Sequence, residues 1–225
     1  MEHAHAIDSL VLGYDPGGDG NHGVAALCVE GNSIIKIEVS SKQTVETAIT
    51  WFEGEISANK TRQVSLGVDT LTVWCTGKCG WRPADRRLRE AYPAAANSIV
   101  APNSLYGAMA VNGMMLMTRL RERNSALVIS EAHPKVMYYA LASTRYDYSS
   151  NAVAMRTSLA GWLEFDGPPL GNEHEWDALA SAYAIYQGQR GRWTTDLHTL
   201  PTNDGESLVW PAGRTHFYWP AIPVR

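Results

Sequence analysis

The 225-residue sequence lacks any apolar run that approaches the roughly 18 residues needed to cross a membrane. It has only three cysteines, an odd number that does not suit a disulfide framework and is typical of a reducing compartment. The opening residues, MEHAHA, show neither the basic nor the apolar part of a secretory signal peptide. We therefore expect a cytoplasmic protein that does not act at a membrane.

An excess of either charge is also missing, because 19 Lys and Arg stand against 23 Asp and Glu. This near balance excludes a disordered polyelectrolyte and a protein that coats nucleic acid with a wholly basic surface. Hydrophobic residues make up 45% of the chain, which is enough for a sizeable core. We expect a single domain over residues 1–225, with a core at about 8–189 and a packed C-terminal extension at 190–225.

Short apolar runs alternate with helical patterns along the chain. Strands are predicted at 8–16, 63–69 and 126–131, and a hairpin at 23–29 and 33–39 around the turn signal Gly31-Asn32. Helices are predicted at 43–57, 84–91, 104–123, 133–143, 151–164 and 174–187. This alternation predicts an α/β fold in which helices cover a largely parallel sheet, and the hairpin makes that sheet mixed.

Three of the predicted strands end in an acidic residue. Asp15 and Asp69 each complete the pattern Leu-Gly-x-Asp, and Glu131 ends the third strand. Ligands of open α/β sheets bind beyond the carboxyl ends of the strands, so these carboxylates are expected to converge. Asp177, near the start of the last apolar helix, is expected at the edge of the same buried face. Each acid alone could serve a local turn or helix start, but the four together favour a catalytic site.

Carboxylates gathered in this way repel one another unless a proton or a cation neutralises them. Mg²⁺ and Mn²⁺ prefer carboxylate oxygens, and two such ions can activate water and stabilise the leaving oxygen in phosphodiester hydrolysis. We predict a two-ion site held by Asp15, Asp69 and Asp177, with Glu131 assisting as a ligand or beside the ligands. His174 is either a further ligand or base, or a group that caps or packs the helix locally.

Two features of the sequence are candidates for holding phosphate. The glycine-rich turn after Asp15, which includes Gly17 and Gly18, either directs backbone N–H groups at a phosphate or only connects the hairpin. It lacks the Lys-Ser/Thr of a P-loop and the GxGxxG spacing. The second feature is a basic cluster that follows the Asp69 loop, in which the expected phosphate contacts are Arg82, Arg86 and Arg89.

Other polar features are interpreted as structural. The second basic group is taken as solvated helix surface and consists of Arg119, Arg121, Arg123 and Lys135. Cys75 and Cys79 have CxxxC spacing, but there is no second cysteine pair to complete a zinc site, so free thiols are expected.

Several motifs, taken in order, resemble the domain of unknown function 429 family of predicted RNase H-like nucleases. They are LGYDPGG with Asp15, GVDT with Asp69, RPADRRLR from Arg82, SEAHP with Glu131, HEWDA with Asp177 and ESLVWP from Glu206. The first motif also resembles that of Holliday-junction resolvases. The resemblance covers roughly residues 8–211. It implies an RNase H-like fold, with a mixed five-stranded sheet of order 3-2-1-4-5 whose second strand is antiparallel. It also implies a metal-dependent nuclease site at the ends of strands one and four and on the last helix.

The leading interpretation is a divalent-metal-dependent phosphodiesterase that acts on DNA or RNA. Two alternatives remain open, because a fold does not fix a function. One is a nucleotide-binding or phosphoryl-transfer protein that uses the loop at 17–23, and the other is a non-catalytic module that has kept the fold. The sequence indicates no particular oligomeric state.

Overall fold

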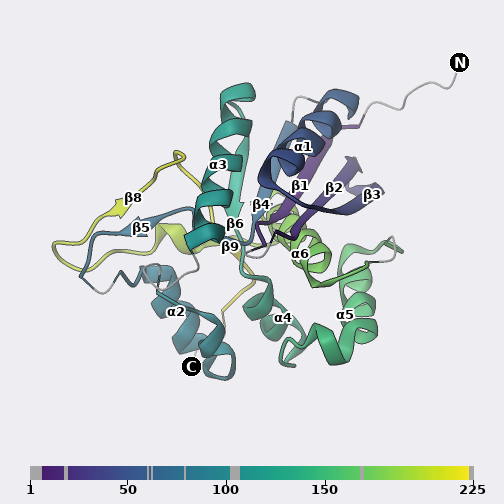
Figure 1. Ribbon diagram of the computed structural model, residues 1–225. Helices are drawn as coiled ribbons and strands as arrows, with labels where there is room; N and C mark the ends of the chain where they lie inside the picture. Colours follow the sequence, from purple (N-terminus) through teal and green to yellow (C-terminus); the bar gives the residue numbers. More distant parts are fainter. Residues whose placement is uncertain are drawn as a thin grey trace, which may run out of the picture.

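A mixed five-stranded sheet forms the centre of the computed structural model, which describes residues 7–17, 20–59, 61, 63–78, 80–101, 107–167 and 170–222 (Figure 1). Its strand order is β3-β2-β1-β4-β6, with β2 antiparallel to both neighbours and β1, β4 and β6 parallel. These strands are β1 (Ser9–Asp15), β2 (His22–Glu30), β3 (Ser33–Lys42), β4 (Gln63–Val68) and β6 (Val128–Glu131). This order and these directions confirm the predicted RNase H-like fold.

Helices cover both faces of the sheet because side chains of β1 alternate between two cores. Leu10, Leu12 and Tyr14 face a core shared with α1 (Val45–Asn59) and α3 (Gly107–Arg123), whereas Val11 faces the other core. That second core contains α2 (Pro83–Ala91), α4 (Pro134–Ala142), α5 (Tyr148–Leu163) and α6 (Glu173–Gln189). Asp15 lies four residues after Val11 in β1, so its side chain is on the same face of the sheet, which is the face that α6 covers.

Glycines let α6 lie directly on the sheet. Gly13 of β1 and Gly67 of β4 are neighbours in the parallel register. A Cβ atom on Gly13 would lie 2.0 Å from the carbonyl oxygen of Ala178, and one on Gly67 would lie 1.9 Å from that of Ser181. The Leu-Gly-x-Asp pattern therefore has a structural meaning: its glycine admits the helix, and its aspartate comes two residues later.

The C-terminal extension runs back to the far edge of the sheet. The backbone of His216 exchanges hydrogen bonds with β6, donating to Ile129 at 2.9 Å and accepting from Glu131 at 2.8 Å. The extension also forms two short antiparallel strand pairs. One pairs β5 (Trp74–Cys75) with β8 (Leu208–Val209), and the other pairs β7 (Thr195–Asp196) with β9 (Tyr218–Trp219).

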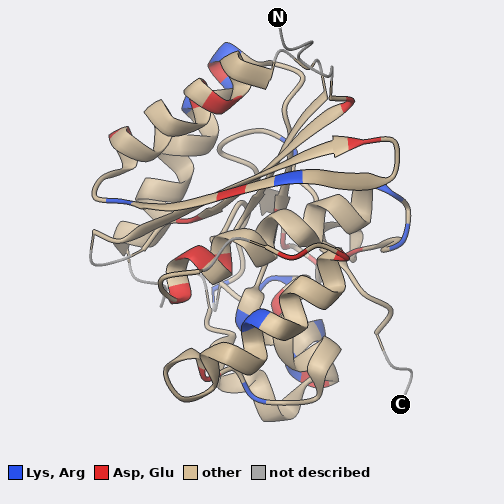
Figure 2. Ribbon diagram, turned by 90° about the vertical axis from the view of Figure 1, so that its right-hand side faces the viewer, with Lys and Arg blue, Asp and Glu red and all other residues tan. Residues whose placement is uncertain are grey.

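Acidic and basic residues are interspersed along the ribbon in the view of Figure 2. Within the described ranges, no helix combines the length and the hydropathy that crossing a membrane requires.

Candidate active site

Asp15 and Asp69 lie side by side at the carboxyl edge of the sheet. Tyr14 and Val68 are partners in the parallel register, and the backbone N–H of Asp69 donates to the carbonyl of Tyr14 at 2.9 Å. Asp15 is 3% exposed and Asp69 is partly buried. The two strands thus bring together residues that are 54 positions apart in the sequence.

Asp177 reaches the same edge from α6. The side chain of Asn172 caps this helix by accepting from the backbone N–H of Glu175 at 3.0 Å, and Asp177 is the helix's fifth residue. Its carboxyl group is buried, and Oδ1 has no hydrogen-bond partner among the described residues. A buried carboxylate oxygen without a partner is costly, and a proton or a cation bound there would lower that cost.

Burial and neighbouring carboxylates shift the pKa values of Asp69 and Asp177 in the same direction. Burial, followed by the charge of Asp15, raises the pKa of Asp69 well above its usual range. Burial, followed by the charges of Asp69 and Asp15, does the same to the pKa of Asp177. Both carboxyl groups hold protons more tightly than ordinary aspartates, which is the behaviour of acids that share too little compensating positive charge.

His174 contacts Asp15 and does not cap the helix. Its Nδ1 lies 2.6 Å from Oδ2 of Asp15, and its side chain is 22% exposed. The cap is Asn172, so the interpretation of His174 as a capping group does not hold. With the proton on Nδ1, the imidazole donates to Asp15 and carries its lone pair on Nε2.

Glu131 is held in a separate, buried ion-pair network. Arg82 binds it with both terminal nitrogens, Nη1 to Oε2 at 2.7 Å and Nη2 to Oε1 at 2.6 Å. The backbone N–H of Thr72 donates to Oε2 at 2.9 Å. Burial alone would raise the pKa of Glu131, but Arg82 and His198 hold it well below its usual range. Both oxygens are occupied, which does not fit the predicted role as a metal ligand or catalytic group.

The predicted phosphate-binding arginines are occupied as well. Arg82 is 3% exposed and also pairs with Asp85 at 2.7 Å, so it has no donor to offer a phosphate. Arg89 donates to the carbonyls of Ala96 and Ile99 at 2.7 and 2.8 Å and stacks on Trp81. Arg86 forms a partly exposed ion pair with Glu206 at 3.1 Å. Local sequence could not reveal these partners, because a run of arginines has the same pattern on a solvated helix.

The glycine turn does not present a phosphate cradle at Gly17. This residue is buried, and its backbone N–H points back to Oδ1 of Asp15 at 3.5 Å. Its φ is +41°, and a Cβ atom there would lie 1.5 Å from the carbonyl oxygen of Asn21, so only glycine fits at this position. Gly18 and Cys79 lie outside the described residues, while Cys28 and Cys75 are free thiols.

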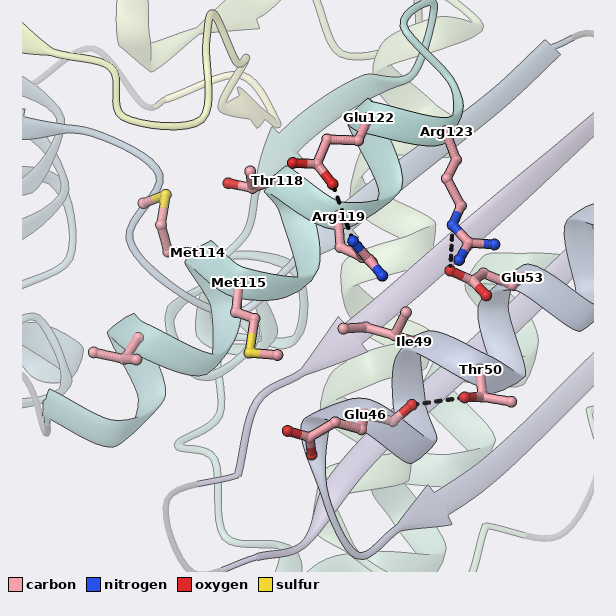
Figure 3. Close-up of a pocket in the computed structure, with 11 residues that line it drawn as sticks. Glu46, Ile49, Thr50, Glu53, Met114, Met115, Thr118, Arg119, Glu122 and Arg123 are labelled. Atoms are coloured by element: carbon pink, nitrogen blue, oxygen red, sulfur yellow. Dashed lines mark hydrogen bonds and ion pairs between the residues drawn. The ribbon is translucent and has the colours of Figure 1, made fainter.

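Cavity size does not locate this site. A cavity of about 840 Å³ lies between α1 and α3, and none of the three aspartates lines it (Figure 3). It is lined by Ile49, Met114 and Met115 and bordered by an ion pair of 2.9 Å between Arg123 and Glu53. A smaller cavity of about 230 Å³ does reach the site, because Asp69 and Lys135 both line it.

Lys135 and Tyr146 are the site residues that sequence reasoning missed. The positive charge of Lys135 interacts with those of Asp177, Asp69 and Asp15. Tyr146 faces Asp177 from the connection between α4 and α5. The only sequence signal was the position of Lys135, four residues after Glu131, which puts it at the carboxyl edge of β6.

No protein-family model matches the chain, and no curated protein matches it. Two solved structures of RuvC from Thermus thermophilus are similar to it, one of them in complex with a Holliday junction substrate. Both are 14% identical over 81% of this chain and 96% of the other, with TM-scores of 0.42 and 0.44. Membership of the domain of unknown function 429 family therefore stays a prediction from the motifs.

Proposed function

We propose that this protein hydrolyses phosphodiester bonds in nucleic acid with the help of divalent metal ions held by Asp15, Asp69 and Asp177. The observation that supports this most directly is the clustering of these three carboxylates beside an Asp177 oxygen that has no partner. The choice of nucleic acid as substrate comes from the motif resemblance to RNase H-like nucleases. The backbone N–H of Gly17, which points back to Asp15, gives no support to the alternative of a nucleotide-binding loop.

The donor set fits Mg²⁺ or Mn²⁺ in its chemistry. Three carboxylates supply the hard oxygen ligands that these ions prefer, and Oδ1 of Asp177 is a buried lone-pair donor. Among the described residues, no group of three His, Cys, Asp or Glu side chains is already arranged as a metal cage. Ion binding would therefore draw the carboxylates closer together. When bound, such ions polarise the phosphodiester and activate water.

The protein's own contribution is to orient and to move a proton. Asp15 fixes the imidazole of His174 through the 2.6 Å contact to Nδ1. Held in this orientation, the imidazole of His174 is placed to act as general base for the attacking water. Burial of Asp177 and Asp15 keeps bulk water from the ion-binding side of the site.

Substitution of the aspartates tests this function. In Asp15→Asn, Asp69→Asn and Asp177→Asn, cleavage of labelled DNA and RNA substrates in Mg²⁺ or Mn²⁺ should fall to background. The reason is that the amide removes the negative charge that holds the ions. The substrates should include single strands, duplexes and four-way junctions, and gel electrophoresis measures the products.

Asp204→Asn is the matched control, since Asp204 is exposed and lies in the C-terminal extension away from the cluster. It should cleave as the wild type does. Circular dichroism of each variant checks that the fold is retained. Metal-dependent cleavage by folded Asp15→Asn at the wild-type rate would show that the function is assigned to the wrong residues.

A further inference from the structure

Lys135 enters the aspartate site from the connection that follows β6. It is the second residue of α4, and this connection is fixed to β4 because the backbone N–H of Ala132 donates to the carbonyl of Val68 at 2.8 Å. Val68 immediately precedes Asp69. Lys135 and Asp69 also line the same cavity of about 230 Å³. The backbone thus anchors the lysine next to the carboxyl end of β4.

Tyr146 links the lysine to the third aspartate. The ammonium nitrogen of Lys135 lies 5.3 Å from the centroid of the Tyr146 ring. That ring packs edge-on against Trp176 at 5.5 Å between centroids, and Trp176 is the residue before Asp177. The Tyr146 hydroxyl is buried, makes no hydrogen bond of normal geometry and faces Asp177. One aromatic side chain therefore contacts both the lysine and the helix turn that carries Asp177.

The charges around Lys135 are predominantly negative. Asp177, Asp69, Glu173 and Asp15 all act on its ammonium group, and they keep the pKa of Lys135 above its ordinary value although burial acts in the opposite direction. The lysine side chain as a whole is exposed, so it is not locked in place by packing. It supplies positive charge to the cluster and has room to move away.

We propose that Lys135 is the built-in counter-ion of the aspartate cluster and that a divalent cation binds by displacing its ammonium group. This inference rests on the proposed function, because it takes the three aspartates as the cation site. An ammonium group and a metal ion compete because each neutralises the same carboxylates. The exchange also accounts for carboxylates that gather at one edge without forming a ready-made cage.

The test is the affinity for Mn²⁺ of variants without the lysine charge, measured by titration calorimetry in the absence of nucleic acid. Lys135→Met should bind Mn²⁺ about tenfold more tightly than the wild type at low salt and about pH 8, equivalent to about 1.4 kcal/mol. Lys135→Arg keeps the charge and should stay within about twofold of the wild type. Lys135→Gln is a second neutral variant and should follow Lys135→Met.

Lys36→Met is the matched control. The ammonium group of Lys36 also has a carboxylate partner, Glu38 at 2.9 Å, but Lys36 lies on β3 level with Leu10 of β1, at a distance along the sheet from Asp15. Its removal should leave Mn²⁺ affinity unchanged. Thermal unfolding adds a second measurement: in EDTA, Lys135→Met should melt below the wild type, and Mn²⁺ should raise its melting temperature more.

The outcomes separate the two proposals. Equal or weaker Mn²⁺ affinity in both neutral variants, in a protein that still cleaves nucleic acid, would overturn the counter-ion role and leave the proposed function standing. Absence of Mn²⁺ binding in the wild type and in both neutral variants would overturn both proposals. Binding that appears only in the neutral variants would support the exchange even if no nucleic-acid cleavage is found.

Discussion

At the scale of single residues, the pKa values of the acids at the strand ends shift in opposite directions for identifiable reasons. Burial acts on Glu131 as it does on Asp69, yet the pKa of Glu131 is lowered and that of Asp69 is raised. The difference is Arg82, whose guanidinium grips both oxygens of Glu131, while Asp69 has other carboxylates as neighbours. In the sequence the two acids occupy the same kind of position. The arginine that separates their roles lies 49 residues from Glu131, so no local pattern could have shown it.

Glu131→Gln should expose this difference in the pH dependence of stability. The folded-state pKa of Glu131 lies below its unfolded value of about 4.3, so its contribution is present above that pH and is lost as the pH falls towards the folded-state pKa. Removal of one partner from a buried pair costs about 3–5 kcal/mol. The variant should therefore be less stable by about that amount at neutral pH, and should lose less stability than the wild type between about pH 5 and pH 2. Urea denaturation at a series of pH values measures both quantities.

Glu122→Gln serves as the control for that experiment. Glu122 forms an exposed pair with Arg119 at 3.4 Å within α3, and such pairs contribute at most about 1 kcal/mol. Its stability should follow the wild-type pH profile. If Glu131→Gln lost as much stability as the wild type when the pH falls, the buried pair would not govern the acid sensitivity of the fold.

At the scale of elements, the sequence predicted the parts of the site that follow from alternation and periodicity. The strand predicted at 63–69 is β4 at Gln63–Val68, and the helix predicted at 174–187 is α6 at Glu173–Gln189. These two elements, with β1, place the three aspartates, which is why the cluster could be anticipated. The helix predicted at 151–164 is α5, which begins three residues earlier, at Tyr148. Asp147 sets this start, because its side chain caps the helix by accepting from the backbone N–H of Ser150 at 3.2 Å.

Elements that depend on distant partners could not be predicted in this way. The two-residue strands β5 and β8 join Trp74 to Val209, and neither segment carries an alternating pattern long enough to indicate a strand. The same limit applies to Lys135, because its place beside the aspartates depends on the connection between β6 and α4, where Ala132 binds the backbone of β4.

The contact between α6 and the sheet can be tested by adding one methyl group. Gly67→Ala should destabilise the protein by about 3 kcal/mol, because its Cβ atom would lie 1.9 Å from the carbonyl oxygen of Ser181 and α6 would have to shift. The same shift would displace Asp177 and lower Mn²⁺ affinity. Chemical denaturation and calorimetry measure the two effects.

Gly54→Ala gives the opposite expectation with the same substitution. Gly54 lies in α1 with nothing within 4 Å of an added Cβ atom, so alanine should stabilise the helix by up to about 1 kcal/mol. If Gly67→Ala were as stable as Gly54→Ala, the close approach of α6 to β4 would not be a constraint on this fold.

At the scale of the whole molecule, the C-terminal extension is joined to the core by the same network that holds Glu131. The hydroxyl of Thr215 lies 2.8 Å from that of Thr72, which in turn donates to Glu131 at 3.1 Å. His198, in the 3-10 helix η3 (Leu197–Thr199), reaches the same carboxylate at 3.5 Å. The extension therefore contacts the residues that hold Glu131 behind the aspartate site.

Phe217→Ala tests whether the extension and the core unfold as one unit. Phe217 is 1% exposed and belongs to the same core as α6, so its truncation should cost about 3–5 kcal/mol. If the chain is one cooperative domain, circular dichroism and tryptophan fluorescence should report a single transition at a lower temperature. Val209→Ala, at an exposed position of the same extension, should change stability by less than about 0.5 kcal/mol. A side chain buried in a shared core cannot be removed without weakening the whole core. Two separate transitions, or a core transition whose temperature Phe217→Ala does not change, would therefore show that residues 190–225 form an independent unit.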